Sequence, residues 1–245
     1  MSPDAALAAA TTPAAARYSM VVTRDPLDVL AAQRLRAQVF GAEWGVALGA
    51  FDQDRFDDHC DHLLVRDDLS GAVVGTYRLL PPQRAAAGLY SAEEFDLTAL
   101  DPLRPGLVEA GRSCVHPDHR NGAVVGLVWS GIARYLDEHG HRWLAGCASV
   151  PLDDGGALAA RVWDAVSRRH YAPPRHRVHP HREFRPGPTT ARGPLPPLLR
   201  GYLRLGAQVC GRPAHDEEFG VADFFVLLDF AAVDHRYLRY WGVAG

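Results

Sequence analysis

Charged residues interrupt two segments whose other residues are typical of buried strands. In LVEAGRSCV (107–115) they are Glu109 and Arg112, and in VVGTYRLL (73–80) it is Arg78. Burial disfavours the charged form of a carboxyl group, so Glu109 is expected to have a raised pKa and to accept a proton near neutral pH. Arg112 is expected either to orient Glu109 or to hold a carboxylate through two hydrogen bonds. In the alternative, Glu109 is only the ion-pair partner of Arg112.

A second group of charged residues precedes these strands. Asp58 and Asp61 lie at the start of a short predicted strand, and Arg36 lies in the preceding predicted helix. Charged residues at positions where a core should be apolar point to a functional site. The alternative is a salt-bridge cluster of Arg36, Asp58, Asp61 and Arg78 at the surface, which would contribute little to stability.

A glycine turn lies between the predicted strand that ends at Val115 and an apolar predicted helix. The turn contains Arg120, Asn121 and Gly122. Backbone N–H groups at the start of a helix lie at the positive end of the helix dipole and bind anions. The turn therefore predicts an anion site, although the signal is weak when taken alone.

The surrounding sequence predicts the elements that must position these residues. Predicted strands cover 18–24, 62–66, 72–80, 107–115, 143–149 and 221–230, and predicted helices cover 26–40, 123–138, 155–169 and 195–205. The second and third strands are expected to form an antiparallel hairpin across an acidic glycine turn. The order predicts an α/β protein with one mixed sheet and helices on both faces. Residues 1–17 are expected to be a disordered tail. Residues 18–245 are expected to form one domain, with a basic, proline-rich segment at about 170–197.

Composition excludes several kinds of chemistry. All 26 basic residues are Arg, so a Schiff-base lysine and a Walker-type phosphate loop are excluded. No apolar run is long enough to span a membrane. The four cysteines occur singly, which disfavours zinc ribbons and redox dithiols and favours a reducing cytoplasm. The spacing of the 12 histidines matches no zinc site. We therefore expect no metal and no tightly bound cofactor.

The charged residues together resemble a known family. The series Arg36, Phe40, Trp44, Asp58, Asp61, Arg78, Glu109 and Arg112 resembles the acyl-homoserine-lactone synthases. Longer segments are more similar to a sister family, the ornithine N-acyltransferases of ornithine-lipid synthesis. They are RLRAQVFGAEWG, FDDHCDHLLVRD, VVGTYRLL, VEAGRSCVHPDHRNG, GCASVP, LPPLLRGYLRLGA and HDEEFGVADFFVLLD. They span roughly residues 34–240. The resemblance implies a GNAT-type fold with a mostly antiparallel sheet.

The resemblance also implies a reaction and its partners. A (3-hydroxy) fatty acyl group would pass from acyl carrier protein to the α-amine of ornithine, giving lyso-ornithine lipid. The substrate would contact Arg36, Trp44, Asp58, Asp61 and Arg78. We expect peripheral contact with an anionic membrane and no binding of nucleic acid.

Acyl transfer from a thioester to an amine needs a base, an oxyanion site and a proton for the leaving thiolate. Glu109 is the predicted base. Backbone N–H groups around Ser113 to Val115 would stabilise the oxyanion. Ser149, which ends a predicted strand, would protonate the thiolate or would only cap the strand.

The glycine turn departs from the GNAT pattern that grips coenzyme A. That pattern is Arg/Gln-x-x-Gly-x-Gly/Ala, whereas Gly122 comes one place early and Val125 stands where a small residue is usual. A phosphopantetheine arm presents a single phosphate, which needs fewer hydrogen-bond donors from the turn than the pyrophosphate of coenzyme A does. Val115, Arg120, Asn121 and Gly122 are therefore predicted to hold acyl-phosphopantetheine, and acyl-coenzyme A is the alternative donor.

Two other functions remain open at this point. A signal synthase would use the same charged pattern to bind S-adenosylmethionine. A non-catalytic module would use the basic segment to bind a membrane or nucleic acid, but that interpretation leaves Glu109 and Arg112 unexplained. The segment LPPLLRGYLRLGA favours the lipid enzyme.

Charge is unevenly distributed along the chain. The net charge is −3, yet residues 161–204 contain ten Arg and only two acidic residues, a balance of +8. Such a segment can attract an acidic carrier protein or anionic lipid. The alternative is a solvated loop that binds nothing.

We expect replacement of Arg168, Arg169, Arg175 and Arg177 by Ser to raise KM for an acyl carrier protein donor with little change in kcat. Charges at the rim of an interface act mainly on association and are screened by salt, with a Debye length of about 8 Å at physiological ionic strength. Steady-state kinetics over a salt series should therefore show a difference that shrinks as salt rises. Unchanged KM together with unchanged binding to anionic vesicles would leave the segment as a solvated face.

Overall fold

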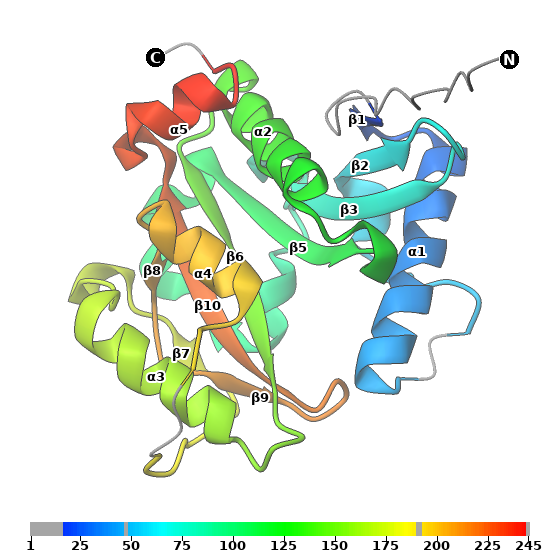
Figure 1. The fold of residues 1–245 in the computed structure, drawn as a ribbon. Helices are drawn as coiled ribbons and strands as arrows, with labels where there is room; N and C mark the ends of the chain where they lie inside the picture. Colours follow the sequence, from blue (N-terminus) through cyan, green and yellow to red (C-terminus); the bar gives the residue numbers. More distant parts are fainter. Residues whose placement is uncertain (1–16, 47–48, 190–192, 244–245) are drawn as a thin grey trace, which may run out of the picture.

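The computed structural model describes residues 17–46, 49–189 and 193–243, and an eight-stranded sheet forms its centre (Figure 1). Its strands are β1 (Tyr18–Thr23), β2 (Asp61–Asp67), β3 (Val73–Leu80), β5 (Leu107–Val115), β6 (Trp143–Pro151), β8 (Gln208–Val209), β9 (Ala214–Asp216) and β10 (Val221–Asp229). Across the sheet the order is β1-β2-β3-β5-β6-β10-β8, with β9 also paired to β10. Every pair is antiparallel except β5 with β6. The mixed, mostly antiparallel sheet and the predicted hairpin, β2 with β3, are therefore confirmed.

The described residues form five α-helices. They are α1 (Pro26–Trp44), α2 (Gly122–Glu138), α3 (Ala157–Arg169), α4 (Pro197–Arg204) and α5 (His235–Tyr240). The side chain of Asp25 caps α1 by accepting the backbone N–H groups of Leu27 and Asp28. The helix continues four residues beyond the predicted end at Phe40 and stops where Gly45 takes a left-handed conformation. This extension places Trp44 one turn after Phe40, on the same side of the helix.

Helices cover both faces of the sheet, as predicted. Helix α2 buries Val124, Val128 and Ile132 in the same cluster as Leu63 and Val65 of β2. Helix α1 packs on the opposite face, where Val39 and Phe40 contact Cys114 of β5. Within the described residues, no helix is long and apolar enough to cross a membrane.

The segment between β3 and β5 has no counterpart in the prediction. It consists of short 3₁₀ turns, namely η3 (Pro82–Arg84), η4 (Tyr90–Glu93) and η5 (Thr98–Gly106). In its middle, β4 (Phe95–Asp96) pairs with β7 (His179–Pro180) as a separate two-stranded sheet. Phe95, Leu97 and Leu100 are buried in one cluster with Phe225 of β10. This segment therefore packs on the central sheet at β10.

Of the predicted tail, residues 1–16 lie outside the described part of the chain. Arg17 is described, and its guanidinium forms a 2.8 Å ion pair with Asp67.

Strands β5 and β6 separate soon after they begin to pair. Their parallel pairing covers only residues 107–109 and 143–145. Immediately beyond it, Gly146 lies so close to β5 that a Cβ atom would overlap the carbonyl oxygen of Ala110. Glycine at this position therefore allows the two backbones to remain in contact up to the point where they separate.

We expect Gly146→Ala to lower the free energy of unfolding by about 1–3 kcal/mol, because an added methyl group would push two backbones apart. Denaturant titration measures this quantity. The control is Gly126→Ala in α2, where a Cβ meets nothing within 4 Å. Greater helix propensity should leave that variant unchanged or stabilised by up to about 1 kcal/mol. Equal effects of the two substitutions would show that the strands have room to separate.

Candidate active site

A cavity of about 310 Å³ opens where β5 and β6 separate. Its apolar wall includes Phe40, Trp44, Leu80 and Leu198, and charged residues from several elements line the remainder. Trp44 stacks on Phe40 with ring centroids 4.6 Å apart. The predicted substrate-contacting residue Trp44 therefore lies at the cavity because α1 extends beyond its predicted end.

A β-bulge brings Glu109 and Arg112 to the same cavity. Residues three apart on a regular strand point to opposite faces of a sheet. In β5 the pairing with β3 shifts register, so that Arg112 and Ser113 together lie opposite Tyr77. Arg112 takes a φ of 50°, in the left-handed region that side chains other than glycine rarely adopt. The extra residue reverses the alternation of β5, and both charged side chains line the cavity.

Glu109 is buried and accepts two backbone hydrogen bonds. The N–H groups of Tyr90 and Ser91 donate to its carboxylate at 2.6 Å and 2.8 Å. Burial raises the pKa of Glu109, although these N–H groups oppose the shift. Within the described residues, Glu109 forms no ion pair or hydrogen bond with Arg112. The expectation that Arg112 pairs with Glu109 or orients it directly is therefore wrong, because the bulge turns Arg112 toward a different loop.

That loop, residues 52–57, supplies the partners of three arginines. Arg36 is completely buried, and its guanidinium pairs with Asp52 at 2.7 Å and with Asp57 at 2.8 Å. Arg78, which lines the cavity, pairs with Asp54 at 2.6 Å. Burial by itself would raise the pKa of Asp57, but the hydrogen bonds and charges of Arg36 and Arg78 lower it to about 2. Arg36 does not line the cavity, so the structure does not support its predicted contact with substrate. Instead, Arg36 holds the loop of residues 52–57 in place through its ion pairs.

The two aspartates that were predicted to contact substrate, Asp58 and Asp61, do not line the cavity. Asp58 is exposed, and Asp57 takes its predicted place beside the arginines. Asp61 shares the alternation of Leu63 on β2 and therefore points to the opposite face of the sheet, where its carboxylate accepts a 2.6 Å hydrogen bond from Tyr135. The three-residue spacing of Asp58 and Asp61 is also the spacing of Asp54 and Asp57, and only the fold distinguishes the two pairs.

Arg112 is the least engaged of the three arginines. Its pairs with Asp54 and Asp52 measure 3.3 Å and 3.7 Å, longer than a strong charge-assisted hydrogen bond. Its buried Nε makes no hydrogen bond. The guanidinium lies 5.2 Å from the ring centroids of both Tyr90 and Phe219. Aromatic rings thus hold the cation in the cavity while leaving donors free for a ligand.

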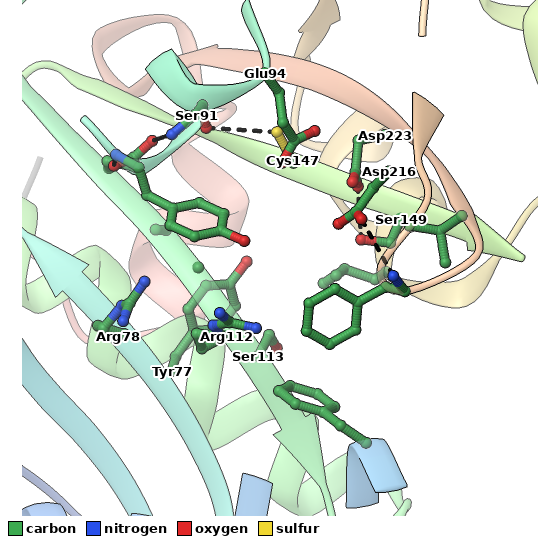
Figure 2. A pocket seen from close by; sticks show the side chains of 18 of the residues that line it. Tyr77, Arg78, Ser91, Glu94, Arg112, Ser113, Cys147, Ser149, Asp216 and Asp223 are labelled. Atoms are coloured by element: carbon green, nitrogen blue, oxygen red, sulfur yellow. Dashed lines mark hydrogen bonds between the residues drawn. The ribbon is translucent and has the colours of Figure 1, made fainter. Parts of the chain in front are cut away.

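Acidic residues that the sequence did not predict as site residues line the side of the cavity opposite Arg112 (Figure 2). Asp223 of β10 is 3% exposed and accepts a 2.6 Å hydrogen bond from the hydroxyl of Ser149 on β6. Glu94 and Cys147 lie beside them, with their ligand atoms and that of Asp223 within 4.8 Å of one another. Asp223 stands within an apolar strand, the same signal that identified Glu109. Glu94 follows a 3₁₀ turn, where no periodicity marks it.

The glycine turn lies at the start of α2. The side chain of Asn121 accepts the N–H groups of Ala123 and Val124 and so occupies donors that a phosphate would need. Arg120 donates to the carbonyl of Val115 and forms an ion pair with Glu43, a cavity residue. Gly122 is the first residue of α2. The predicted donor-binding residues do not themselves line the described cavity; they are Val115, Arg120, Asn121 and Gly122.

Comparisons with known proteins identify the family of this chain. The family model described as an acetyltransferase (GNAT) domain matches residues 35–130. The L-ornithine N(alpha)-acyltransferase of Brucella abortus (strain 2308) is 37% identical, with 87% of this chain and 85% of that protein aligned. The protein of the same name from Rhodobacter capsulatus is 35% identical, with 91% and 94% aligned. This chain belongs to the L-ornithine N(alpha)-acyltransferase family. It is therefore an enzyme, an acyltransferase.

Solved structures with the same fold are more distant from this family member. The coenzyme A-dependent acyl-homoserine lactone synthase BjaI is 18% identical, and its two structures have TM-scores of 0.53 and 0.54. In the structure with S-adenosylmethionine and isopentyl-CoA, 90% of this chain and 85% of that chain are aligned. FeeM, an N-acyl amino acid synthase from uncultured soil microbes, is 13% identical, with a TM-score of 0.53 and coverage of 88% and 91%. The family member therefore has the predicted GNAT-like fold.

We expect Asp57→Asn to lower the free energy of unfolding by about 3–5 kcal/mol, because it leaves the charge of Arg36 buried with a weaker partner. The adjacent, exposed Asp58→Asn is the matched control and should change stability by no more than about 0.5 kcal/mol. Denaturant titration of both variants gives the comparison. Similar losses in the two would contradict the assignment of Asp57 as the partner of Arg36.

The same ion pair predicts a pH dependence. Because the folded protein holds the pKa of Asp57 at about 2, below its unfolded value of about 3.9, the carboxylate stabilises the fold above about pH 4. That contribution is lost as pH falls through about 2. The free energy of unfolding of the unaltered protein should therefore fall more steeply than that of Asp57→Asn over this interval. Parallel curves would show that Asp57 does not titrate in this way.

Proposed function

We propose that this acyltransferase moves a (3-hydroxy) fatty acyl group from the phosphopantetheine arm of acyl carrier protein to the α-amine of ornithine, giving lyso-ornithine lipid. The observation that carries the proposal is the bulge in β5. It presents a buried carboxylate, Glu109, and a partly engaged guanidinium, Arg112, to one cavity at the separation of two strands. The names of the sequence relatives support ornithine as the acceptor.

The acceptor amino acid binds through its two backbone groups. Arg112 takes the α-carboxylate, since its Nε has no hydrogen bond and planar guanidinium groups match carboxylates in geometry. Glu109 accepts a proton from the α-ammonium, and its raised pKa brings its proton affinity closer to that of an amine. The N–H groups of Tyr90 and Ser91 hold the carboxylate in place during this transfer.

The free α-amine then attacks the thioester carbonyl. The C–N bond forms, the carbonyl oxygen becomes an oxyanion, and the C–S bond breaks as the tetrahedral intermediate collapses. Beyond Glu109, the edge of β5 that faces β6 has no strand partner among the described residues, so its N–H groups are available to the oxyanion. The departing thiolate takes up a proton, for which the hydroxyl of Ser149 at the cavity wall is the candidate donor.

The turn before α2 favours a carrier protein as donor. Asn121 already occupies two of the first N–H groups of the helix, which leaves a poor cradle for a pyrophosphate. A phosphopantetheine arm brings one phosphate, for which Arg120 and the start of α2 at Gly122 suffice. Acyl-coenzyme A is the alternative donor that the assay below distinguishes.

The basic segment supplies a surface for the acidic carrier protein or for anionic lipid. Arg168, Arg169 and Arg175 are exposed. Arg177 is half-buried, with its guanidinium 4.4 Å from the ring centroid of Tyr171. A triple Ser variant that keeps Arg177 therefore tests docking without disturbing this packing. A reducing cytoplasm, where carrier protein and ornithine are both present, is consistent with the four free cysteines.

The signal-synthase alternative is not favoured. The aligned relatives that carry the ornithine acyltransferase name cover about nine-tenths of this chain at 34–37% identity. The acyl-homoserine lactone synthases BjaI and MesI share its fold at 18% and 17% identity. The non-catalytic alternative fails because the chain is a member of an enzyme family.

An assay with purified protein tests the proposal. Acyl carrier protein and coenzyme A, each loaded with the same acyl chain, are supplied with ornithine, and the product is identified by mass spectrometry. We expect N-acyl-ornithine, with a higher kcat/KM for the carrier protein donor. Equal kcat/KM for both donors would contradict the carrier preference, and no acylated ornithine with either donor would contradict the proposed reaction.

We expect Glu109→Gln to lower kcat/KM about 10² to 10⁴-fold, the usual contribution of a general base. Glutamine keeps an oxygen that can accept an N–H group from η4, so the melting temperature should change little. In the unaltered enzyme kcat/KM should rise with pH as Glu109 loses its proton, and this limb of the profile should vanish in the variant. A folded variant with an unchanged pH profile would remove Glu109 from the chemistry.

A further inference from the structure

The cavity has two ends of opposite charge (Figure 2). Arg112 lies at one end, and Glu94, Asp216 and Asp223 lie across from it. The proposed reaction uses Arg112, Glu109 and the hydroxyl of Ser149 but assigns nothing to Glu94 or Asp223. Glu94 comes from the turn after η4 and Asp223 from β10, so two distant parts of the chain converge there.

The acidic end lacks a cation of its own. Among the described residues, neither Glu94 nor Asp223 forms an ion pair with a basic side chain, whereas the loop aspartates 52, 54 and 57 all do. Asp223 is almost fully buried, and the buried Oε2 atom of Glu94 makes no hydrogen bond. Burying carboxylates without a partner is costly unless a proton or a cation neutralises them.

Asp216 differs from the other two acidic residues. Its carboxylate accepts the N–H groups of Glu218 and Phe219 and so shapes the turn before β10. Among the described residues, no backbone N–H group donates to the carboxylates of Glu94 and Asp223, which we call the acidic pair. Burial and their mutual repulsion raise the pKa of Glu94, and burial raises that of Asp223. Burial and charge repulsion therefore favour a state in which the two carboxyl groups share one proton.

We propose that the acidic pair binds the side-chain ammonium of the acceptor and thereby selects a diamino acid. This inference rests on the proposed function, in which Arg112 takes the α-carboxylate. An ammonium group has three N–H donors, and the oxygen atoms of the two carboxylates converge here to accept them. The incoming cation replaces the shared proton, so the net charge of the site does not change.

The arrangement explains selection by charge rather than by size. An amino acid with the same carbon chain but no terminal amine would leave the acidic pair without a partner in a buried site. Sites built to hydrogen-bond a substrate group reject analogues that lack it far more strongly than apolar pockets reject a missing methylene. The preference for ornithine should therefore reach at least about 100-fold.

The test compares ornithine with norvaline, which has the same chain without the terminal amine. Calorimetry measures binding of each to the unaltered protein, to Glu94→Gln and to Asp223→Asn, and the acylation assay measures kcat/KM. We expect the unaltered protein to prefer ornithine at least about 100-fold in both measurements. Each variant should lose at least about tenfold toward ornithine while norvaline changes less than about twofold.

Glu93→Gln is the matched control. Glu93 precedes Glu94 in the chain, but it is exposed, pairs with Arg55 and does not line the cavity. Its replacement removes the same charge from the same turn, so the preference for ornithine should be retained. Loss of preference in this control would assign the effect to long-range charge and overturn the proposed contact.

Proton release gives a second measurement. The ionisable groups that face the pair are Asp216, Glu109, Cys147, Tyr90 and Arg112. Ornithine binding near neutral pH should displace the shared proton, so its heat should depend on the ionisation heat of the buffer beyond any dependence seen for norvaline. Identical proton release for the two amino acids would contradict displacement from the pair.

Other outcomes separate this inference from the proposed function. Acylation of ornithine and norvaline at equal kcat/KM would overturn the inference while the acyl transfer stands. An equal loss toward both amino acids in the variants would assign the pair to chemistry or folding and also overturn it. A divalent metal found in the purified protein and lost in both variants would make Glu94, Cys147 and Asp223 a metal site instead.

Discussion

The bulge at Arg112 and Ser113 is the constraint on which the site depends. Without it, the period of two along β5 would turn Glu109 to one face of the sheet and Arg112 to the other. With it, one buried strand presents a carboxylate and a guanidinium to a single cavity. The left-handed backbone of Arg112 is the local cost, of the order of 1–3 kcal/mol. Strained backbone of this kind persists only where the surrounding structure holds it in place.

The surrounding structure holds it through buried ion pairs. Arg36 of α1 binds Asp52 and Asp57, and the same loop carries Asp54, which faces Arg78 and Arg112. A buried charge is tolerated only when it is paired, so this loop, α1 and the two strands must fold together. The cluster therefore orients the cavity arginines although most of its members never reach the cavity. The cluster holds Arg112 beside Asp52 and Asp54, while the Nε atom of Arg112 makes no hydrogen bond.

Charge is balanced differently at the two ends of the cavity. At the arginine end, three aspartates match three arginines within the protein. At the acidic end, neither Glu94 nor Asp223 forms an ion pair with a basic side chain in the described part of the chain, and burial raises the pKa of both. A pocket that leaves one guanidinium partly free and one acidic pair unmatched is complementary to a zwitterion that carries an additional positive charge.

Local sequence determined much of this protein. The spacing of apolar residues predicts most of the long strands and helices. This is because a strand that buries one face alternates apolar and polar residues, whereas a helix that buries one face repeats apolar residues every three or four positions. Charged residues within apolar strands identified Glu109, Arg112 and Arg78. Tertiary structure decided the rest. Spacing could not distinguish Asp54 and Asp57 from Asp58 and Asp61, because both pairs are three residues apart and only the direction of each side chain separates them. Nor could it place Glu94 opposite Arg112, because the 3₁₀ segment has no period and its position is set by packing of Phe95 and Leu100 against the far end of the sheet.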